Sequence, residues 1–216
     1  MIAVHSIKAN LVLNRPIQVG FAILDLSKEH MYNFHYNQWM PKFPETKLLF
    51  TDTDSLAYCV RNVNLYAELE KMHGLFDFSN YNKSHPLYSA ANMKKVGFFK
   101  DELGGNIMDK FVGLRPKLYC YTEINNNQIE EKFTAKGVKK SVQEKQLTME
   151  DYENCLQTCK PKSVRMNYIR SDHHQLYTYS TNKIGLSMCD NKRWICDDGI
   201  TTLAHGHYLT KCNMQQ

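Results

Sequence analysis

Hydrophobic residues after Pro16 recur at near-helical spacing. They are Val19, Ile23, Leu26, Met31, Phe34 and Trp39. Proline is favoured in the first turn of a helix, where its missing amide proton would have no partner. The pattern predicts one long, well-buried helix that ends near Pro41. Before it, a short apolar run at residues 10–13 predicts a strand.

Two short apolar runs flank a polar sequence between Lys47 and Val60. Both runs are rich in aromatic and aliphatic residues, which predicts buried strands. The polar sequence between them contains Asp and Ser, whose side chains accept hydrogen bonds in tight turns. We therefore expect a hairpin with Asp52 and Asp54 at its exposed tip.

The rest of the chain alternates between helical, irregular and strand patterns. Asn64 precedes a short helix that stops at Gly74, and Thr148 opens a capped helix that runs to about Lys160. From Val164 onward we expect short strands and turns. The pattern also predicts a loop at residues 77–92, a turn at 125–127, and strands at residues 96–100, 109–121 and 129–134.

Together these elements predict an α+β fold, with an antiparallel sheet packed on helices, followed by a small mixed α/β region. The composition shifts near Gly137, where a lysine-rich stretch begins. We place a domain boundary at this shift, which gives domains at residues 1–138 and 139–216.

The composition is that of an ordinary globular protein. Of 216 residues, 43% are hydrophobic and 23% charged, which excludes a disordered chain, and the formal net charge of +5 permits a polyanionic partner. No apolar run reaches the length of a membrane span and no signal peptide is recognised, so we expect no membrane partner and a nuclear or cytoplasmic location rather than secretion. The seven scattered cysteines fit a reducing compartment, and their spacings do not match a zinc site.

Asp52 and Asp54 are the first candidates for chemistry. If the backbone stays extended, both carboxylates project from one face, with their Cα atoms about 7 Å apart. Two negative charges that close repel each other unless a proton or a cation lies between them. Mg²⁺ suits such a pair because it takes one or two carboxylates and completes its octahedron with water and phosphate oxygens. The alternative is an ordinary acidic hairpin turn without a metal.

A second set of candidates carries positive charge. Lys117 and Tyr119 are expected on one face of a strand, where an ammonium can neutralise a phosphate and a phenol offers a hydroxyl and an aromatic ring. Further along, Gly137 permits close backbone approach within a lysine-rich stretch, which suits a nucleic-acid backbone. The alternatives are an ordinary alternating strand and a solvated lysine face. The lysines of the second stretch are Lys132, Lys136, Lys139, Lys140 and Lys145.

Several ordered motifs resemble those of the family-B DNA polymerases. The sequence Thr51–Ser55 resembles motif C of that family, whose usual form is Tyr-Gly-Asp-Thr-Asp-Ser, and Lys117-x-Tyr119 resembles its Lys-x-Tyr motif. Further segments resemble the protein-primed branch, which includes organellar and viral polymerases of the adenovirus-like type and those of Polinton or Maverick transposons. These segments are Pro16–Gly20, Ser27–Tyr36, Phe111–Arg115, Ala135–Ser141, Met166–Ser171 and Asp197–His207.

The resemblance implies a partial polymerase palm at residues 1–138 and a thumb-like region at residues 139–216. It implies template-directed nucleotidyl transfer in DNA replication, with a DNA primer-template and dNTPs as partners. Asp54 would be a principal ligand of two Mg²⁺ ions, with Asp52 in support. The ions would orient the primer hydroxyl and neutralise the incoming triphosphate.

The same resemblance implies roles for the basic candidates. Lys117 and Tyr119 would contact the primer end and the template-primer backbone, and Thr53 would be a further DNA-binding residue. The residues that would hold the duplex are Lys136, Gly137, Lys139 and Lys140.

Departures from the family pattern limit what this chain is expected to do alone. Phe50 and Thr51 replace the usual Tyr-Gly before motif C. Motif A, an Asp followed by Ser-Leu-Tyr-Pro, and motif B, a Lys with Asn-Ser-x-Tyr-Gly, are absent from the sequence. One metal-binding aspartate, the fingers helix and the proofreading exonuclease are therefore expected on a missing N-terminal part of the polymerase. We expect weak Mg²⁺ binding and little or no turnover by this chain.

Two other functions fit the same residues. One is a non-catalytic, duplex-binding remnant of a viral or transposon polymerase, which would bind through Lys117, Lys136, Lys139 and Lys140. The other is a metal-dependent nuclease built on Asp52 and Asp54, which would need further acidic or histidine ligands.

Overall fold

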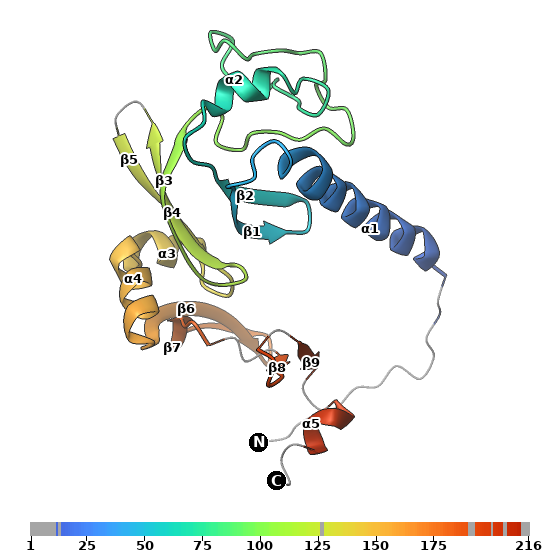
Figure 1. Ribbon diagram of the computed structural model, residues 1–216. Helices are drawn as coiled ribbons and strands as arrows, with labels where there is room; N and C mark the ends of the chain where they lie inside the picture. The colour runs from blue at the N-terminus through green and yellow to red at the C-terminus, as the bar shows by residue number, and fades with distance from the viewer. Residues whose placement is uncertain are drawn as a thin grey trace. The chain divides into compact units, whose positions relative to one another are not determined.

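The computed structural model of the chain describes residues 12, 14–125, 128–189, 193–199, 201–204 and 207–212. Short antiparallel sheets occur together with helices, so the α+β class is confirmed (Figure 1). The chain divides into two compact units, residues 1–65 and 66–216. Within the described residues, none of the helices is both long enough and apolar enough to cross a lipid bilayer.

The first unit contains one long helical segment and one hairpin. Helix α1 spans Ile17–Tyr32 and continues as a π-helix, η1, over Asn33–Trp39. Strands β1, Lys47–Asp52, and β2, Ser55–Cys59, pair antiparallel. The predicted helix and hairpin are therefore confirmed, whereas the strand predicted at residues 10–13 lies outside the described residues apart from Val12, which is in no strand.

The prediction of a well-buried helix is wrong for most of α1. Val19, Ile23 and Leu26 are 51–64% exposed. Burial begins at the last turn of α1 and in η1, and the buried residues are Met31, Phe34 and Trp39. A regular apolar spacing shows which side of a helix could be buried, but it does not supply the partner that covers that side.

Aromatic packing joins the helical segment to the hairpin. The ring of Trp39 lies between Phe43, at 4.7 Å between centroids, and Tyr58 of β2, at 4.6 Å and nearly parallel. Tyr58 also shares a 2.8 Å hydrogen bond between its hydroxyl and Nδ1 of His35, and burial raises the pKa of Tyr58 to about 12. These contacts cover one face of a two-stranded sheet, so β1 and β2 are only partly buried and the prediction of buried strands is wrong.

The second unit is organised around a three-stranded antiparallel sheet. Its strands are β3, Ile107–Arg115, β4, Leu118–Asn125, and β5, Gln128–Ala135, in that spatial order. The predicted strand at 109–121 thus contains two strands and the turn between them, and residues 126–127 of the predicted turn at 125–127 lie outside the described residues. The remaining elements are α2, Leu65–Glu70, α3, Lys140–Gln146, α4, Met149–Thr158, β6, Lys162–Asp172, β7, Gln175–Leu186, β8, Arg193–Ile195, β9, Thr202–Ala204, and α5, Tyr208–Cys212.

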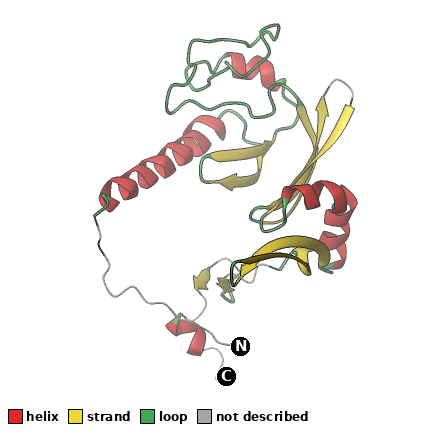
Figure 2. Cartoon of the chain, turned by 180° about the vertical axis from the view of Figure 1, so that it is seen from behind, coloured by secondary structure: helices red, strands yellow, loops and turns green. Residues whose placement is uncertain are grey.

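One hydrophobic core joins the sheet, α4 and the base of the β6–β7 hairpin (Figure 2). Tyr152 of α4 is fully buried in it, together with Cys120 of β4 and Leu186 of β7. Val138 belongs to the same core, so a single packed unit continues across the predicted boundary at 138/139. As a division between palm and thumb, that boundary stays a prediction.

Helix α4 begins as its sequence predicts. The hydroxyl of Thr148 accepts a hydrogen bond from the Asp151 amide, and the Asp151 carboxylate accepts one from the Thr148 amide, which forms a capping box. Lys162 of β6 forms a 2.5 Å ion pair with Asp151. The helix ends at Thr158 because Cys159 adopts a left-handed conformation with φ of 57°.

A long irregular segment, residues 71–106, connects α2 to β3. The predicted loop at 77–92 is confirmed, but the predicted strand at 96–100 is wrong, since this stretch forms only an isolated bridge between Phe76 and Phe99. Val96 is completely exposed. The segment nonetheless has its own apolar packing, and its buried apolar residues are Met72, Phe76, Phe78, Tyr81 and Leu87.

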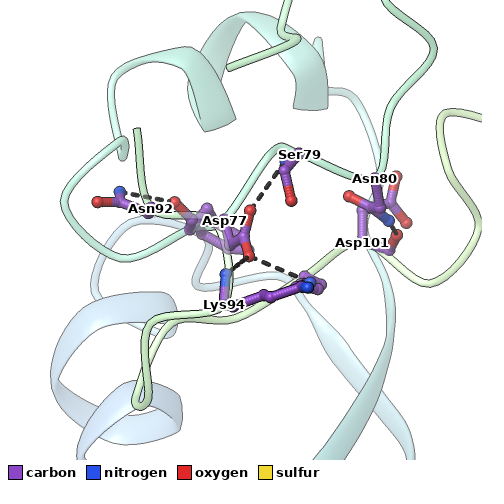
Figure 3. A network of polar contacts seen from close by, with 8 residues as sticks. Asp77, Ser79, Asn80, Asn92, Lys94 and Asp101 are labelled. Carbon is purple, nitrogen blue, oxygen red and sulfur yellow. Dashed lines mark hydrogen bonds and ion pairs between the residues drawn. The ribbon is translucent and has the colours of Figure 1, made fainter. Parts of the chain in front are cut away.

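Asp77 holds this irregular segment together (Figure 3). Its carboxylate accepts hydrogen bonds from the amides of Ser79, at 2.9 Å, and Lys94, at 3.1 Å, and forms a 3.1 Å ion pair with Lys100. Burial acts to raise the pKa of Asp77, but the hydrogen bonds from Ser79, Lys100 and Lys94 outweigh it and hold the pKa well below its usual range. One buried carboxylate thus connects residues 79, 94 and 100 of this segment, in which the predicted strand does not form.

Substitution of this carboxylate should cost stability in a pH-dependent way. Because the folded-state pKa is lowered, the stabilisation is complete above the unfolded-state pKa of about 4 and is lost as the pH falls through the folded-state value. We expect Asp77→Asn to lower the free energy of unfolding by about 2 kcal/mol at pH 7. The difference from the wild type should shrink below pH 4. Urea unfolding followed by circular dichroism at several pH values measures both effects.

The matched control is Asp109→Asn, which removes an exposed carboxylate from β3 in the same unit. It should change the free energy of unfolding by less than about 0.5 kcal/mol. Equal effects of the two substitutions would contradict the role given to Asp77.

Candidate nucleic-acid interface

The acidic turn lies between β1 and β2, as expected. Asp52 pairs with Ser55, which leaves Thr53 and Asp54 as the two turn residues. The Asp54 amide donates to the Asp52 carbonyl at 2.7 Å, around a Thr53 φ of 59°. The backbone is therefore not extended through Asp54, and the side-by-side arrangement of two carboxylates on one strand face does not occur. Thr53 lies in the turn itself, with its side chain exposed.

The carboxylates of this turn differ in their surroundings. Asp52 is partly buried and its Oδ1 accepts a 3.3 Å hydrogen bond from the Thr53 hydroxyl, whereas Asp54 is exposed. Two carboxylates are donors that fit a hard, largely hydrated cation such as Mg²⁺. In the part of the chain that the structure describes, no group of three or more His, Cys, Asp or Glu side chains is placed to hold a metal ion. The turn therefore fits partial ligation, and Mg²⁺ binding stays a prediction.

Lys117 lies in the turn between β3 and β4, and not on a strand. Arg115 pairs with Leu118, so Pro116 and Lys117 form a two-residue turn in which Lys117 has a φ of 60°. The expectation that Lys117 and Tyr119 share a strand face is therefore wrong. Tyr119 is in β4, partly buried, with its ring 5.6 Å from that of Phe111. Pro116 fixes the first turn residue and thereby helps to place Lys117 at the end of the sheet.

Strand pairing brings Lys117 next to Lys136. Leu118 of β4 is opposite Ala135 of β5, and the Lys136 amide donates to the Lys117 carbonyl at 3.1 Å. Gly137 follows with a φ of 93°, a conformation that favours glycine. Two lysines that are 19 positions apart in the sequence thus lie side by side at one end of the sheet.

A third lysine reaches this turn from β7. Nζ of Lys183 donates to the Gly137 carbonyl at 3.3 Å. A Cβ atom at residue 137 would lie only 3.1 Å from the same Nζ, so the glycine also leaves room for the ammonium. Sequence analysis missed Lys183, because no spacing rule links it to a residue 46 positions away.

Lys139 is held at the same end of the unit. Its Nζ donates to the Asn167 carbonyl of β6 and lies 4.6 Å from the centroid of the Tyr168 ring. Lys140 differs, since its side chain is 91% exposed and its closest acidic partner is Glu144, at 4.0 Å. We call Lys117, Lys136, Lys139 and Lys183 the basic end.

Comparisons of the chain with protein-family models, with curated proteins and with solved structures found no match. The function is therefore argued from the geometry of the acidic turn and the basic end, with the motif resemblance as a hypothesis.

The positive φ of Thr53 leads to a prediction about the acidic turn. A β-branched residue is strained in the left-handed region, whereas glycine is not. We expect Thr53→Gly to stabilise the first unit by up to about 1 kcal/mol. In a Trp194→Phe background, Trp39 is the only tryptophan and packs on Tyr58 of the hairpin, so its fluorescence during urea unfolding reports on this unit.

Thr51→Gly provides the comparison, because residue 51 is in β1 and has no positive φ. There the loss of a β-branched residue from a strand should destabilise the hairpin by up to about 1 kcal/mol. Destabilisation of similar size by both substitutions would show that Thr53 is not strained.

Proposed function

We propose that this chain is the nucleic-acid-binding palm and thumb portion of a DNA polymerase of the family-B type. The observation that carries the proposal is the basic end, in which strand pairing and long-range contacts gather lysines from the β3–β4 turn, the end of β5 and β7. The motif resemblance implies that Lys117, Lys136 and Lys139 contact duplex DNA, and the structure adds Lys183 to them. The ligand at the basic end is the phosphate backbone of a duplex.

The way in which the lysines are held supports this ligand. Nζ of Lys139 and Nζ of Lys183 each donate to a backbone carbonyl, which uses one of the three protons of each ammonium. The remaining protons can reach phosphate oxygens without a large loss of side-chain freedom on binding. Neutralisation of phosphates releases condensed counterions, so binding is expected to be strong at low salt and independent of sequence.

A second function concerns the acidic turn. In a complete polymerase, Asp52 and Asp54 would supply part of the ligand set for Mg²⁺, and the metal would neutralise the incoming triphosphate. The observation in favour is that Asp52 precedes, and Asp54 lies in, a tight, strained turn between paired strands. Strained backbone at a polar turn is often retained for function.

Removal of the basic end should weaken duplex binding and reduce its salt dependence. We expect the triple substitution Lys117→Ala, Lys136→Ala and Lys139→Ala to weaken binding of a 20-bp duplex. The logarithm of the association constant decreases linearly with the logarithm of the salt concentration. The magnitude of this slope should fall by about 0.9 for each phosphate contact that is lost. Fluorescence anisotropy between about 50 and 300 mM salt, over which the Debye length falls roughly twofold, measures both quantities.

The control is a triple alanine variant of three exposed lysines elsewhere in the same unit, Lys71, Lys83 and Lys94. It removes the same net charge, so a general effect of charge would weaken binding equally. Equal slopes for the two triple variants, or no duplex binding by the wild type even at low salt, would overturn the proposed interface.

Primer extension separates duplex binding from catalysis by this chain. With Mg²⁺, dNTPs and a primer-template, we expect no detectable incorporation, because the turn supplies only two carboxylates. Incorporation that disappears in Asp54→Ala would show instead that the chain contains a complete catalytic site.

A further inference from the structure

The β6–β7 hairpin extends beyond the core of the second unit. On the face toward the core, Val164 and Met166 are almost completely buried. Beyond Tyr168 the pairing continues to Asp172 and Gln175, yet every described residue from position 169 to 180 is exposed. The outer half of the hairpin is therefore a free two-stranded ribbon (Figure 2).

Three tyrosines follow one another along one face of this ribbon. Because Tyr168 pairs with Tyr179 and side chains alternate along a strand, Tyr168, Tyr177 and Tyr179 share the face that is buried at the base. Ring centroids are 5.5 Å apart for Tyr168 and Tyr179, and 6.5 Å apart for Tyr177 and Tyr179. Tyr177 and Tyr179 are each 41% exposed. We call these three residues the tyrosine file.

Positive charge flanks the tyrosine file. Lys139 lies over the ring of Tyr168, and Arg170 pairs with Tyr177 in the strand register. Lys183, on the same face of β7, lies nearer the base. The acidic residue on this face is Asp172 at the tip, which His173 contacts at 3.0 Å. The face therefore combines aromatic rings with a net positive charge.

The opposite face of the ribbon has a different character. Its outer part carries hydroxyl side chains together with two exposed apolar residues, Ile169 and Leu176, and amide side chains, Arg165 and the exposed Ile184 follow toward the base. No aromatic residue is on that face, as the sequence and register of the two strands show. This contrast within one hairpin provides a matched internal control.

Aromatic rings beside cations distinguish the ligand from an intact duplex. In a duplex the faces of the bases are stacked on one another and cannot reach a protein ring, whereas unpaired bases can stack on exposed aromatic side chains. Each such stack strengthens binding whatever the base, and flanking Lys and Arg residues follow the phosphates. We propose that the tyrosine file binds single-stranded nucleic acid, with bases on Tyr177 and Tyr179 and phosphates along Lys139, Arg170 and Lys183.

This site deepens the proposed function and rests on it in part, because Lys139 and Lys183 belong to both surfaces. The basic end holds the backbone of a duplex, and the tyrosine file binds a strand that is not paired. The two surfaces bind different ligands. A measurement on each ligand therefore separates a failure of the tyrosine file from a failure of the basic end.

The test compares labelled oligo(dT) of about 20 nucleotides with a blunt duplex, using the full chain and fluorescence anisotropy. We expect Tyr177→Ala with Tyr179→Ala to weaken oligo(dT) binding about tenfold or more and to leave duplex binding within about twofold. The variant Ile169→Ala with Leu176→Ala, on the opposite face, should leave both within about twofold. Tyr177→Phe with Tyr179→Phe should retain oligo(dT) binding, because the rings remain.

Arg170→Ala offers a second measurement at an exposed position. For oligo(dT), it should reduce the magnitude of the slope of the logarithm of the association constant against the logarithm of the salt concentration by about 0.7. This is the value for one phosphate of a single strand. Unchanged oligo(dT) binding by the tyrosine-to-alanine variant, or equal losses for both faces, would overturn the proposal. Duplex binding by the wild type without oligo(dT) binding would overturn it and leave the proposed function standing. Oligo(dT) binding without duplex binding would support the tyrosine file and contradict the basic end.

Discussion

The burial of Tyr152 in α4 is the contact on which the second unit depends. Its side chain is fully buried, its hydroxyl donates to the Thr134 carbonyl of β5 at 3.3 Å, and its ring stacks on Phe133. The same helix packs against Val164 and Met166 at the base of the β6–β7 hairpin within one core. Tyr152 thus fixes the end of β5 through its own contacts, and the core around it joins α4 to the start of the hairpin. These two elements position the basic end and the tyrosine file.

Helix α3 transmits this packing to the backbone around Gly137. Gln143 donates through Nε2 to the carbonyls of Ala135, at 3.1 Å, and Val138, at 2.8 Å, so both sides of the turn are held. The Lys183 ammonium binds the carbonyl between them. Three hydrogen bonds from side chains outside the turn therefore add to its own backbone bond between Val138 and Ala135, and they fix the turn next to the lysines.

Sequence analysis succeeded where the determining interactions are local. The hairpin turn at Asp52–Ser55 and the capping box at Thr148 are each formed by residues within three positions of one another. The lysine-rich stretch at 136–140 is likewise visible as composition. Helix α3 was missed because its sequence has no cap and almost no buried apolar residue.

Sequence analysis failed where a distant partner decides the outcome. The segment at 96–100 has the residues of a strand, but its backbone pairing is limited to an isolated bridge with Phe76, and the carboxylate of Asp77, about 20 positions earlier, binds the Lys94 amide and the Lys100 ammonium. Likewise, nothing near Lys117 shows that a turn places it beside Lys136, and nothing near Lys183 shows that it reaches Gly137. Such contacts follow from strand register, which the pattern of single segments does not determine.

The two candidate sites therefore depend on the fold in different ways. The acidic turn requires only the pairing of β1 with β2 and a strained conformation at Thr53, where glycine would relieve the strain but remove the hydroxyl that donates to Asp52. The basic end requires the core around Tyr152, because its lysines come from three separate elements. A loss of core packing would thus disperse the positive charge of the second unit while the carboxylates of the first unit kept their local geometry. The basic end therefore depends on long-range packing, whereas the acidic turn depends on local pairing. The hydrogen bonds from Lys139 and Lys183 to backbone carbonyls show that the fold holds these two lysines in place.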